Sequence, residues 1–451
     1  METDKKKEGK SGLSRRGFIG GSIAAAAGLG LGKKTPLFAD GQSPEKPRIK
    51  EFRRLGRTGF KVSDIGFGAG YLQNSEVLEA ALDAGINYID TAEHYARGNS
   101  ERTVGQVMKS RDRKTVFITT KMNLKMGPNS KEGLRKRFDN CLERLQLDYV
   151  DCLMLHMTPE ITQITHAPYH DLIRDLKAEG KVRFTGLSNH GREHSMAGPT
   201  KDDMDKVVLA AAEDGRFDVV LFAYNFLQTQ QGEKILTACR ENNMGTTLMK
   251  TNPVKFYRDI ENMFARAKER GREITGPYLE MMEAFRALME GAEPFKTRYG
   301  LRTDEEIRDA AVKFCLNNPL VHTVCPSMNT FDELDTYLAL SGQRLTESET
   351  GLLAAYERDY GRFYCRHACG LCEADCPSGV PVNTIMRYDH YFRAQRREKE
   401  AMSKYAALDR SNASFCFDCS GNCQRACPYS VPVQGLLCLA HQALTLDSAV
   451  G

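Results

Sequence analysis

The sequence lacks several features that would point to particular classes of protein. No low-complexity tract interrupts its 451 residues, which excludes a largely disordered or fibrous chain, whereas the absence of tryptophan excludes nothing. Charge of one sign is also scarce: 63 Lys and Arg nearly balance 59 Asp and Glu, so nothing indicates a nucleic-acid partner. The length is too great for one ordinary domain and suits two domains with a short extension.

Residues 1–40 have the composition of a targeting segment and linker. A basic stretch precedes the paired arginines of Ser14-Arg15-Arg16-Gly17-Phe18-Ile19, and a weakly apolar run, Gly20–Gly32, follows them. This order resembles a twin-arginine export signal. The apolar run, about 13 residues long, is too short to cross a bilayer as a helix. We expect the twin-arginine machinery to export the folded protein to the periplasm, with either cleavage after Ala39 or retention of the segment as a membrane anchor.

Between residues 50 and 345, short β-rich runs alternate with amphipathic helical patterns. Eight such alternations favour an α/β fold of the closed (β/α)8 TIM-barrel type over an open doubly wound sheet. A hairpin over residues 52–62, turning at Thr58-Gly59, is expected to plug the bottom of the barrel. The expected strands are Asp64–Gly68, Asn87–Asp90, Thr115–Thr120, Val150–Leu155, Val182–Leu187, Asp218–Phe222, Gly245–Met249 and Val321–Cys325.

One connection in this barrel is oversized. An insertion at about 251–303 follows the seventh strand. Because the loops that follow barrel strands build the active-site face, we interpret it as a lid or substrate wall. An inert insertion is the alternative.

Four polar side chains are expected at one rim of the barrel, where barrel enzymes carry their catalytic residues. Asp90 and Tyr95 come at the end of the second strand, Lys121 at the end of the third and His156 at the end of the fourth. Lys121 would lower the pKa of Tyr95, and Asp90 would hold that lysine charged. His156 would donate a hydrogen bond to a substrate oxygen. This set suits carbonyl reduction or alcohol oxidation, with a hydride moving to or from a nicotinamide.

These residues resemble the Asp–Tyr–Lys–His tetrad of the aldo-keto reductases. Further motifs occur in the order of that family: Leu55-Gly56-Arg57-Thr58-Gly59, Gly98-Asn99-Ser100-Glu101, Gly186-Leu187-Ser188-Asn189 and Tyr224-Asn225. The resemblance implies a nicotinamide held by Ser188 and Asn189, with Tyr224 and Met249 also in the cofactor site. Leu221 departs from the family pattern, because it stands where a glutamine usually holds the carboxamide.

The loop after the eighth strand bears on the choice of cofactor. Pro326–Asp335 contains no Lys or Arg and carries three acidic residues. A 2′-phosphate needs charge-assisted partners, whereas a carboxylate can accept a hydrogen bond from the 2′-hydroxyl of NAD. The loop therefore favours NAD over NADP, or a site that binds neither well, and Ser327 and Glu333 are expected among the cofactor contacts. Since an exported enzyme cannot count on diffusible cofactor, the nicotinamide is expected to be tightly retained.

Eight of the 14 cysteines fall in two tight groups within residues 346–451. Each group resembles the bacterial ferredoxin run C-x2-C-x2-C-x3-C-P with one extra residue. We expect one or two 4Fe-4S clusters in an α-helical ferredoxin-type domain, with structural zinc and disulfides as alternatives. In two-cluster ferredoxins the fourth cysteine binds the other cluster, which implies that Cys376 joins the second group and Cys427 the first. The expected ligands are Cys365, Cys369, Cys372, Cys376, Cys416, Cys419, Cys423 and Cys427.

These features together predict an exported oxidoreductase that interconverts a carbonyl and an alcohol on a sugar-like small molecule. The clusters would be structural, or would act as an electron outlet toward a redox partner protein. The alternative is an electron-transfer or partner-binding protein built on a catalytically retired barrel.

Overall fold

The computed structural model describes residues 46–72, 74–191, 194–195, 198–199, 202–253, 304–393, 395, 397–408 and 411–445. The expected export signal lies outside these residues, and so does nearly all of the insertion at 251–303. Among the described residues, no helix has the length and apolar character needed to cross a membrane.

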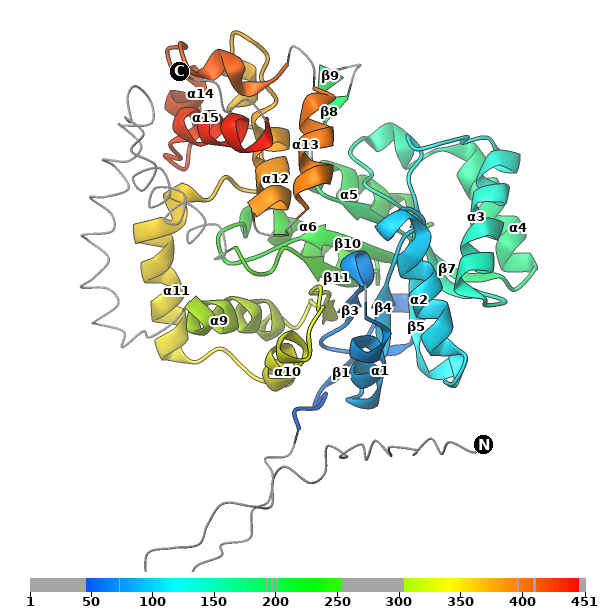
Figure 1. The fold of residues 1–451 in the computed structure, drawn as a ribbon. Helices are drawn as coiled ribbons and strands as arrows, with labels where there is room; N and C mark the ends of the chain where they lie inside the picture. The colour runs from blue at the N-terminus through cyan, green and yellow to red at the C-terminus, as the bar shows by residue number, and fades with distance from the viewer. Residues whose placement is uncertain are drawn as a thin grey trace, which may run out of the picture. The chain divides into compact units, whose positions relative to one another are not determined.

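Eight parallel strands form the central sheet, in the order β12-β11-β10-β7-β6-β5-β4-β3 (Figure 1). Ile65, just before β3, forms a parallel bridge to Val324 of β12. Gly68 forms a second bridge to Ser327, so the two edges of the sheet meet and a (β/α)8 barrel closes, as the alternation predicted. The strands are β3 (Phe67–Gly68), β4 (Tyr88–Asp90), β5 (Phe117–Met122), β6 (Val150–Leu155), β7 (Val182–Asn189), β10 (Val219–Ala223), β11 (Gly245–Met249) and β12 (Thr323–Val324).

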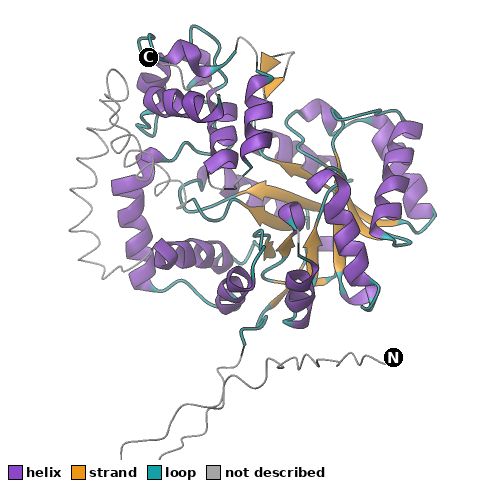
Figure 2. Ribbon diagram, viewed as in Figure 1, coloured by secondary structure: helices purple, strands orange, loops and turns teal. Residues whose placement is uncertain are grey.

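Helices flank the strands of this sheet (Figure 2). They are α1 (Ser75–Asp83), α2 (Asn99–Met108), α3 (Lys131–Leu145), α4 (Ala167–Ala178), α5 (Met204–Asp214), α6 (Gln230–Glu241), α9 (Asp304–Asn317) and α10 (Phe331–Leu340). Helix α3 shows why such a segment is helical. Ser130 caps its first turn by accepting a hydrogen bond from Gly133 N–H at 3.2 Å. Its buried side chains recur every three or four positions and so face the barrel: Leu134, Phe138, Cys141 and Leu145.

The hairpin of β1 (Phe52–Arg54) and β2 (Lys61–Ser63) closes one end of the barrel. Leu55 and Val62 are fully buried and pack in the same cluster as interior side chains of the strands. At Gly56, where φ is +48°, an added Cβ would lie 2.4 Å from the nitrogen of Gly245, the first residue of β11. The hairpin therefore plugs the end at which the strands begin, as predicted, and only glycine fits its closest approach.

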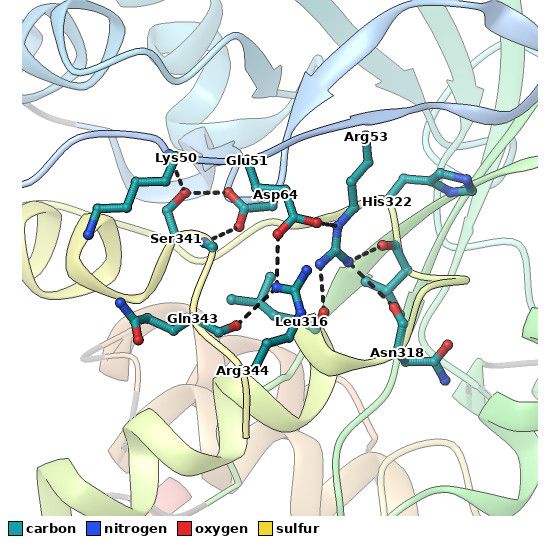
Figure 3. Close-up of polar contacts among 12 residues, drawn as sticks. Lys50, Glu51, Arg53, Asp64, Leu316, Asn318, His322, Ser341, Gln343 and Arg344 are labelled. Carbon is teal, nitrogen blue, oxygen red and sulfur yellow. Dashed lines mark hydrogen bonds and ion pairs between the residues drawn. The ribbon is translucent and has the colours of Figure 1, made fainter. Parts of the chain in front are cut away.

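Polar contacts tie this hairpin to the last elements of the barrel (Figure 3). Arg53 donates to Leu316 O and to Val321 O, each at 2.6 Å, at the carboxyl end of α9. Asp64 accepts from Ser341 Oγ at 2.7 Å, and its burial raises its pKa despite that bond. The Arg53–Leu316 bond satisfies a carbonyl that the end of α9 leaves open, and it joins residues 263 positions apart.

The C-terminal segment, residues 346–445, is helical. It contains α11 (Glu347–Tyr360), α12 (Val382–Arg393), α13 (Glu398–Ala406), α14 (Asn422–Ala426) and α15 (Val433–Leu444). Its buried side chains form one cluster with Phe226 and Leu227, which follow β10, and with Ala310 of α9. The segment thus shares a hydrophobic core with the barrel at the end where β10 finishes.

Candidate active site

The four residues predicted for catalysis meet at the end of the barrel where the strands finish. Asp90 is the last residue of β4, Lys121 lies near the end of β5 and His156 directly follows β6. Lys121 Nζ donates to Asp90 Oδ1 at 2.6 Å and to Thr91 O at 2.7 Å. The same Nζ lies 4.9 Å from the centroid of the Tyr95 ring. The fold therefore brings together a phenol, an ammonium, a carboxylate and an imidazole.

Burial governs the protonation of this group. The side chain of Lys121 has no exposed surface and that of Asp90 is 6% exposed. Burial raises the pKa of Tyr95 well above its ordinary value, and the charge of Asp90 raises it further. Lys121, whose ammonium is hydrogen-bonded to Asp90 and to a carbonyl, does not outweigh these two causes, so the expected net lowering of this pKa is not found. Tyr95 is protonated at neutral pH and can donate its proton.

Two imidazoles lie beside this tyrosine. The His156 ring centroid is 5.5 Å from that of Tyr95, edge-on at 83°. His94 stacks on His156 with the centroids 4.7 Å apart. Burial lowers the pKa of His156 well below its ordinary value and that of His94 to about 4. Both rings are neutral at pH 7, so His156 can donate one N–H to a substrate oxygen. Sequence reasoning missed His94, because adjacency to Tyr95 along the chain gives no sign of this stacking.

The backbone after Tyr95 is strained. Ala96 and Arg97 have φ values of 48° and 57°, in the left-handed region that costs a non-glycine residue roughly 1–2 kcal/mol. The following turn is fixed by Ser100 Oγ, which donates to a carbonyl just after β3 at 2.7 Å, and by Glu101, which accepts from a threonine of β5 at 2.5 Å. This motif therefore directs the loop that carries Tyr95.

Ser188 and Asn189 are the last residues of β7, and both are buried. Ser188 Oγ accepts from Met157 N–H at 3.0 Å. Asn189 donates to Thr158 O at 2.7 Å and accepts from Gly191 N–H at 2.5 Å. The serine hydroxyl proton and one amide proton of Asn189 therefore remain for a ligand such as a carboxamide.

The other strand residues predicted for the cofactor separate into two groups. Met249 packs with Leu221 among the side chains of the barrel interior. Tyr224 instead donates its hydroxyl to Glu233 of α6, and its ring stacks on Phe314 of α9 at 5.7 Å. Side chains alternate between the two faces of a strand, and Tyr224 falls on the outer face of the barrel. It is not placed to contact a nicotinamide, contrary to the expectation.

The loop after β12 holds the two remaining cofactor candidates. Ser327 is exposed beside its bridge to Gly68. Glu333 lies in the first turn of α10, where its Oε2 accepts from Asn329 N–H at 2.8 Å and its own N–H donates to Thr330 Oγ1 at 3.2 Å. One oxygen of Glu333 is thus used to cap the helix, which leaves the other for a ligand hydroxyl.

Helices α12 and α13 lie at the barrel end that carries Tyr95 (Figure 1). Tyr71, just after β3, donates its hydroxyl to Gln395 Oε1 at 2.8 Å. The guanidinium carbon of Arg397 lies 4.6 Å from the Tyr71 ring centroid and 4.8 Å from that of Tyr391. Lys250, which follows β11, places its Nζ 5.2 Å from the same Tyr391 centroid. Sequence reasoning missed this cover, because no local pattern shows that a distant helix packs over the barrel.

The first cysteine group docks on loops of the barrel. An added Cβ at Gly191, just beyond β7, would lie 2.0 Å from Ala368 Cα. Gln228, beyond β10, donates to His367 O. The backbone between Cys365 and Cys369 therefore rests directly on the end of the barrel.

The last cysteine of each group lies near cysteines of the other group. All 14 cysteines are free thiols. Burial is the main cause that raises the pKa of the Cys416 and Cys423 thiols. Neighbouring thiols, among them that of Cys376, raise this pKa further. Among the described residues, no set of three or more His, Cys, Asp or Glu side chains closes around a single metal ion. Cys427 lines one pocket with members of the first group: Cys365, Cys369 and Cys372.

A family model described as Aldo/keto reductase family matches residues 66–357. The chain belongs to the aldo/keto reductase family. The match covers the barrel from β3 through α10 and continues into α11.

Several curated relatives of this aldo/keto reductase are named as oxidoreductases. The NADH-specific methylglyoxal reductase of Escherichia coli (strain K12) is 28% identical over 222 residues, which cover 42% of this chain and 64% of that protein. The L-galactose dehydrogenase of Arabidopsis thaliana is 38% identical over 154 residues, covering 31% and 48%. The D-threo-aldose 1-dehydrogenase of a Pseudomonas species is 27% identical over 225 residues, covering 42% and 65%. The chain thus spans about half to two thirds of the length of these relatives.

Solved structures of the family are also similar to this chain. An aldo-keto reductase from Bacillus halodurans in its holo form is 23% identical, with a TM-score of 0.49, and the match covers 68% of this chain and 95% of that one. An aldo-keto reductase from Klebsiella pneumoniae in complex with NADPH is 21% identical, with a TM-score of 0.48, covering 71% and 98%.

Proposed function

We propose that this protein is an exported aldo-keto reductase that interconverts a carbonyl and an alcohol on a sugar-like substrate. The observation that carries this proposal is the contact of Lys121 with both Asp90 and the Tyr95 ring, beside His156. The names of several relatives support a sugar-like substrate: L-galactose dehydrogenase, D-threo-aldose 1-dehydrogenase and 6-dehydroglucose reductase.

In the direction of reduction, a carbonyl oxygen accepts hydrogen bonds from Tyr95 and His156. When bound, a nicotinamide supplies the hydride that adds to the carbonyl carbon. The electron pair of the broken C=O π bond moves to the oxygen, which takes the proton of Tyr95. Lys121 stabilises the resulting phenolate, and Asp90 keeps that lysine charged and oriented. Oxidation of an alcohol follows the same steps in reverse.

The residues that would hold the nicotinamide are Ser188, Asn189 and Met249, with Ser327 and Glu333 near its 2′-hydroxyl. The remaining donors of Ser188 and Asn189 suit the carboxamide, and the acidic loop that holds Glu333 supports NAD over NADP. Denaturing purified, active protein should release nicotinamide into the supernatant. A cofactor-free supernatant would contradict tight retention.

Tyr95→Phe tests the catalytic assignment. Since it removes the transferred proton and leaves the ring in place, we expect turnover to fall by about 100-fold or more. Tyr149→Phe is the matched control, because Tyr149 precedes β6 at the opposite end of the barrel. Near wild-type turnover in Tyr95→Phe would refute the mechanism and favour a catalytically retired barrel that serves electron transfer or partner binding.

The C-terminal segment is proposed to hold two 4Fe-4S clusters, one on Cys365, Cys369, Cys372 and Cys427 and the other on Cys376, Cys416, Cys419 and Cys423. The pocket lined by the first set supports this division, as do the thiols that surround Cys416. Val380 N–H donates to Cys376 Sγ at 3.3 Å and Gly421 N–H to Cys419 Sγ at 3.4 Å, contacts that stabilise thiolate ligands. The clusters would be structural, or an electron outlet to a redox partner.

Metal analysis of anaerobically prepared protein tests this assignment. Two clusters predict about eight iron and eight acid-labile sulfide per chain, and one cluster about four of each. Stoichiometric zinc would contradict both.

Export is tested separately: replacing Arg15 and Arg16 by lysine should leave the protein in the cytoplasmic fraction, because the twin-arginine route recognises that pair.

A further inference from the structure

The cover over the active site carries more positive charge than its acidic partners neutralise. Arg397 pairs with Glu400 of its own helix. Lys250 forms no ion pair with any carboxylate of the described residues; its Nζ instead faces the ring of Tyr391. A partly buried ammonium that faces only an aromatic ring has lost hydration without gaining a counter-ion.

The two cations face one ring. Lys250 Nζ lies 5.2 Å and the Arg397 guanidinium 4.8 Å from the centroid of Tyr391, so their charges are within about 10 Å of each other. Burial, and then the charges of Arg387 and Arg397, lower the pKa of Lys250 to about 7. A bound anion would relieve both the desolvation and the repulsion, and would restore the full charge of the lysine.

This pair of cations lies next to the reacting group. Gly70 and Tyr71 lie between Tyr95 and Arg397. An added Cβ at Gly70 would lie 3.6 Å from the Tyr95 ring, and the ring centroid of Tyr71 is 4.6 Å from the Arg397 guanidinium. The charges of Arg397 and the ring of Tyr391 both act on the pKa of Tyr95, after burial and Asp90. An anion between Lys250 and Arg397 would therefore belong to the molecule whose carbonyl or alcohol meets Tyr95.

We propose that Lys250 and Arg397, which both lie against the ring of Tyr391, bind a carboxylate of the substrate, so that this enzyme takes acidic sugars in preference to neutral ones. The inference rests on the proposed function, because it assigns a substrate class to the same site. Lys250 acts as a specificity-determining residue: it fixes the acid group and leaves the proton transfer to Tyr95. The neutral analogue that lacks the carboxylate leaves Lys250 without a counter-ion and binds more weakly.

The test compares D-galacturonate with D-galactose, which differ by a carboxylate in place of a hydroxymethyl group. The proteins are the wild type, Lys250→Met, which removes the charge at similar length, and Lys250→Arg, which keeps it. Lys234→Met is the control for loss of a lysine charge, because Lys234 on α6 is 57% exposed and pairs with Asp205. We measure kcat/KM for both sugars and for NAD, and binding of both sugars by calorimetry.

We expect the wild type to prefer galacturonate, and Lys250→Met to lower kcat/KM for that sugar by about 10- to 100-fold, as for a lost charge-assisted hydrogen bond. The value for galactose should change less than about twofold, and Lys250→Arg should restore most of the preference. An equal loss for both sugars, or a wild type that prefers galactose, would overturn the proposal. So would a raised KM for NAD with an unchanged sugar preference, because the anion would then be the cofactor pyrophosphate.

Calorimetry separates this inference from the proposed function. Lysine-dependent binding of galacturonate without turnover would leave the carboxylate site standing and refute the proposed reaction. Failure of the wild type to bind galacturonate would refute the carboxylate site, whatever reaction the tetrad performs.

Discussion

The buried ion pair at the centre of the site should respond very differently to losing one partner and to losing both. Lys121 has no exposed side-chain surface, so Asp90→Leu leaves an ammonium without a counter-charge, at a cost of about 3–5 kcal/mol in the free energy of unfolding. The double variant Asp90→Leu/Lys121→Met replaces the pair by apolar side chains and should lie within about 1 kcal/mol of wild type. A non-additivity of about 3 kcal/mol is therefore expected.

Lys121→Met alone should behave differently with pH. Burial raises the pKa of Asp90, and without Lys121 nothing offsets it, so the folded protein holds a proton on Asp90 that the unfolded chain releases. Because the folded state then binds more protons, stability falls as pH rises, and Lys121→Met should cost less at pH 5 than at pH 8.

Urea unfolding followed by circular dichroism, at pH 5 and pH 8, measures all four proteins. Turnover is measured in parallel, and all three variants should be inactive although the double variant is stable. The reasoning fails if Asp90→Leu costs less than about 1 kcal/mol, since the pair would then be solvated like an exposed one. It also fails if the two single costs simply add.

Two further predictions concern the surroundings of this pair. Gly191→Ala should displace Ala368 and loosen the docked cysteine group, which would be seen as faster proteolysis after residue 345. Gly180→Ala is the control, because Gly180 has a similar positive φ but open space around it, and this variant should not be cleaved faster. Equal proteolysis of both variants would contradict the docking contact. Burial lowers the pKa of His94 to about 4, so below pH 6.5 the unfolded chain binds more protons than the folded protein. The free energy of unfolding should therefore fall by up to roughly 3 kcal/mol between pH 6.5 and pH 4, and by less in His94→Gln. An identical pH profile for the variant would show that His94 is not the group involved.

The barrel could be predicted from the sequence because its strands are short, apolar and regularly spaced, and each expected strand lies within a few residues of an observed one. The tetrad could be placed because strand ends of a barrel meet at one rim. The protonation of Tyr95 could not be predicted, since it depends on how deeply the ring is buried and on which group already occupies the ammonium of Lys121.

Residues that reach the site through tertiary packing could not be predicted from the sequence either. Tyr224 matches a family motif, yet its position on the outer face of β10 turns its ring toward α6 and α9. Lys250 and Tyr391 are 141 positions apart along the chain, and no periodicity indicates that they meet. Motifs thus identified the residues that sit on strands, and missed those whose place is set by a helix packed over them.

The packing of α12 and α13 onto the barrel has a consequence for the order in which the molecule is made. Tyr71 and Gln395, joined by one hydrogen bond, are separated by 324 positions, so this contact cannot form until most of the chain has left the ribosome. The barrel strands are synthesised earlier and can pair by then, since the earlier parts of a chain tend to fold first during synthesis. A contact of such long range also closes slowly. The newly made barrel therefore passes through a period with its reactive end uncovered, and helices α12 and α13, arriving last, would complete the site.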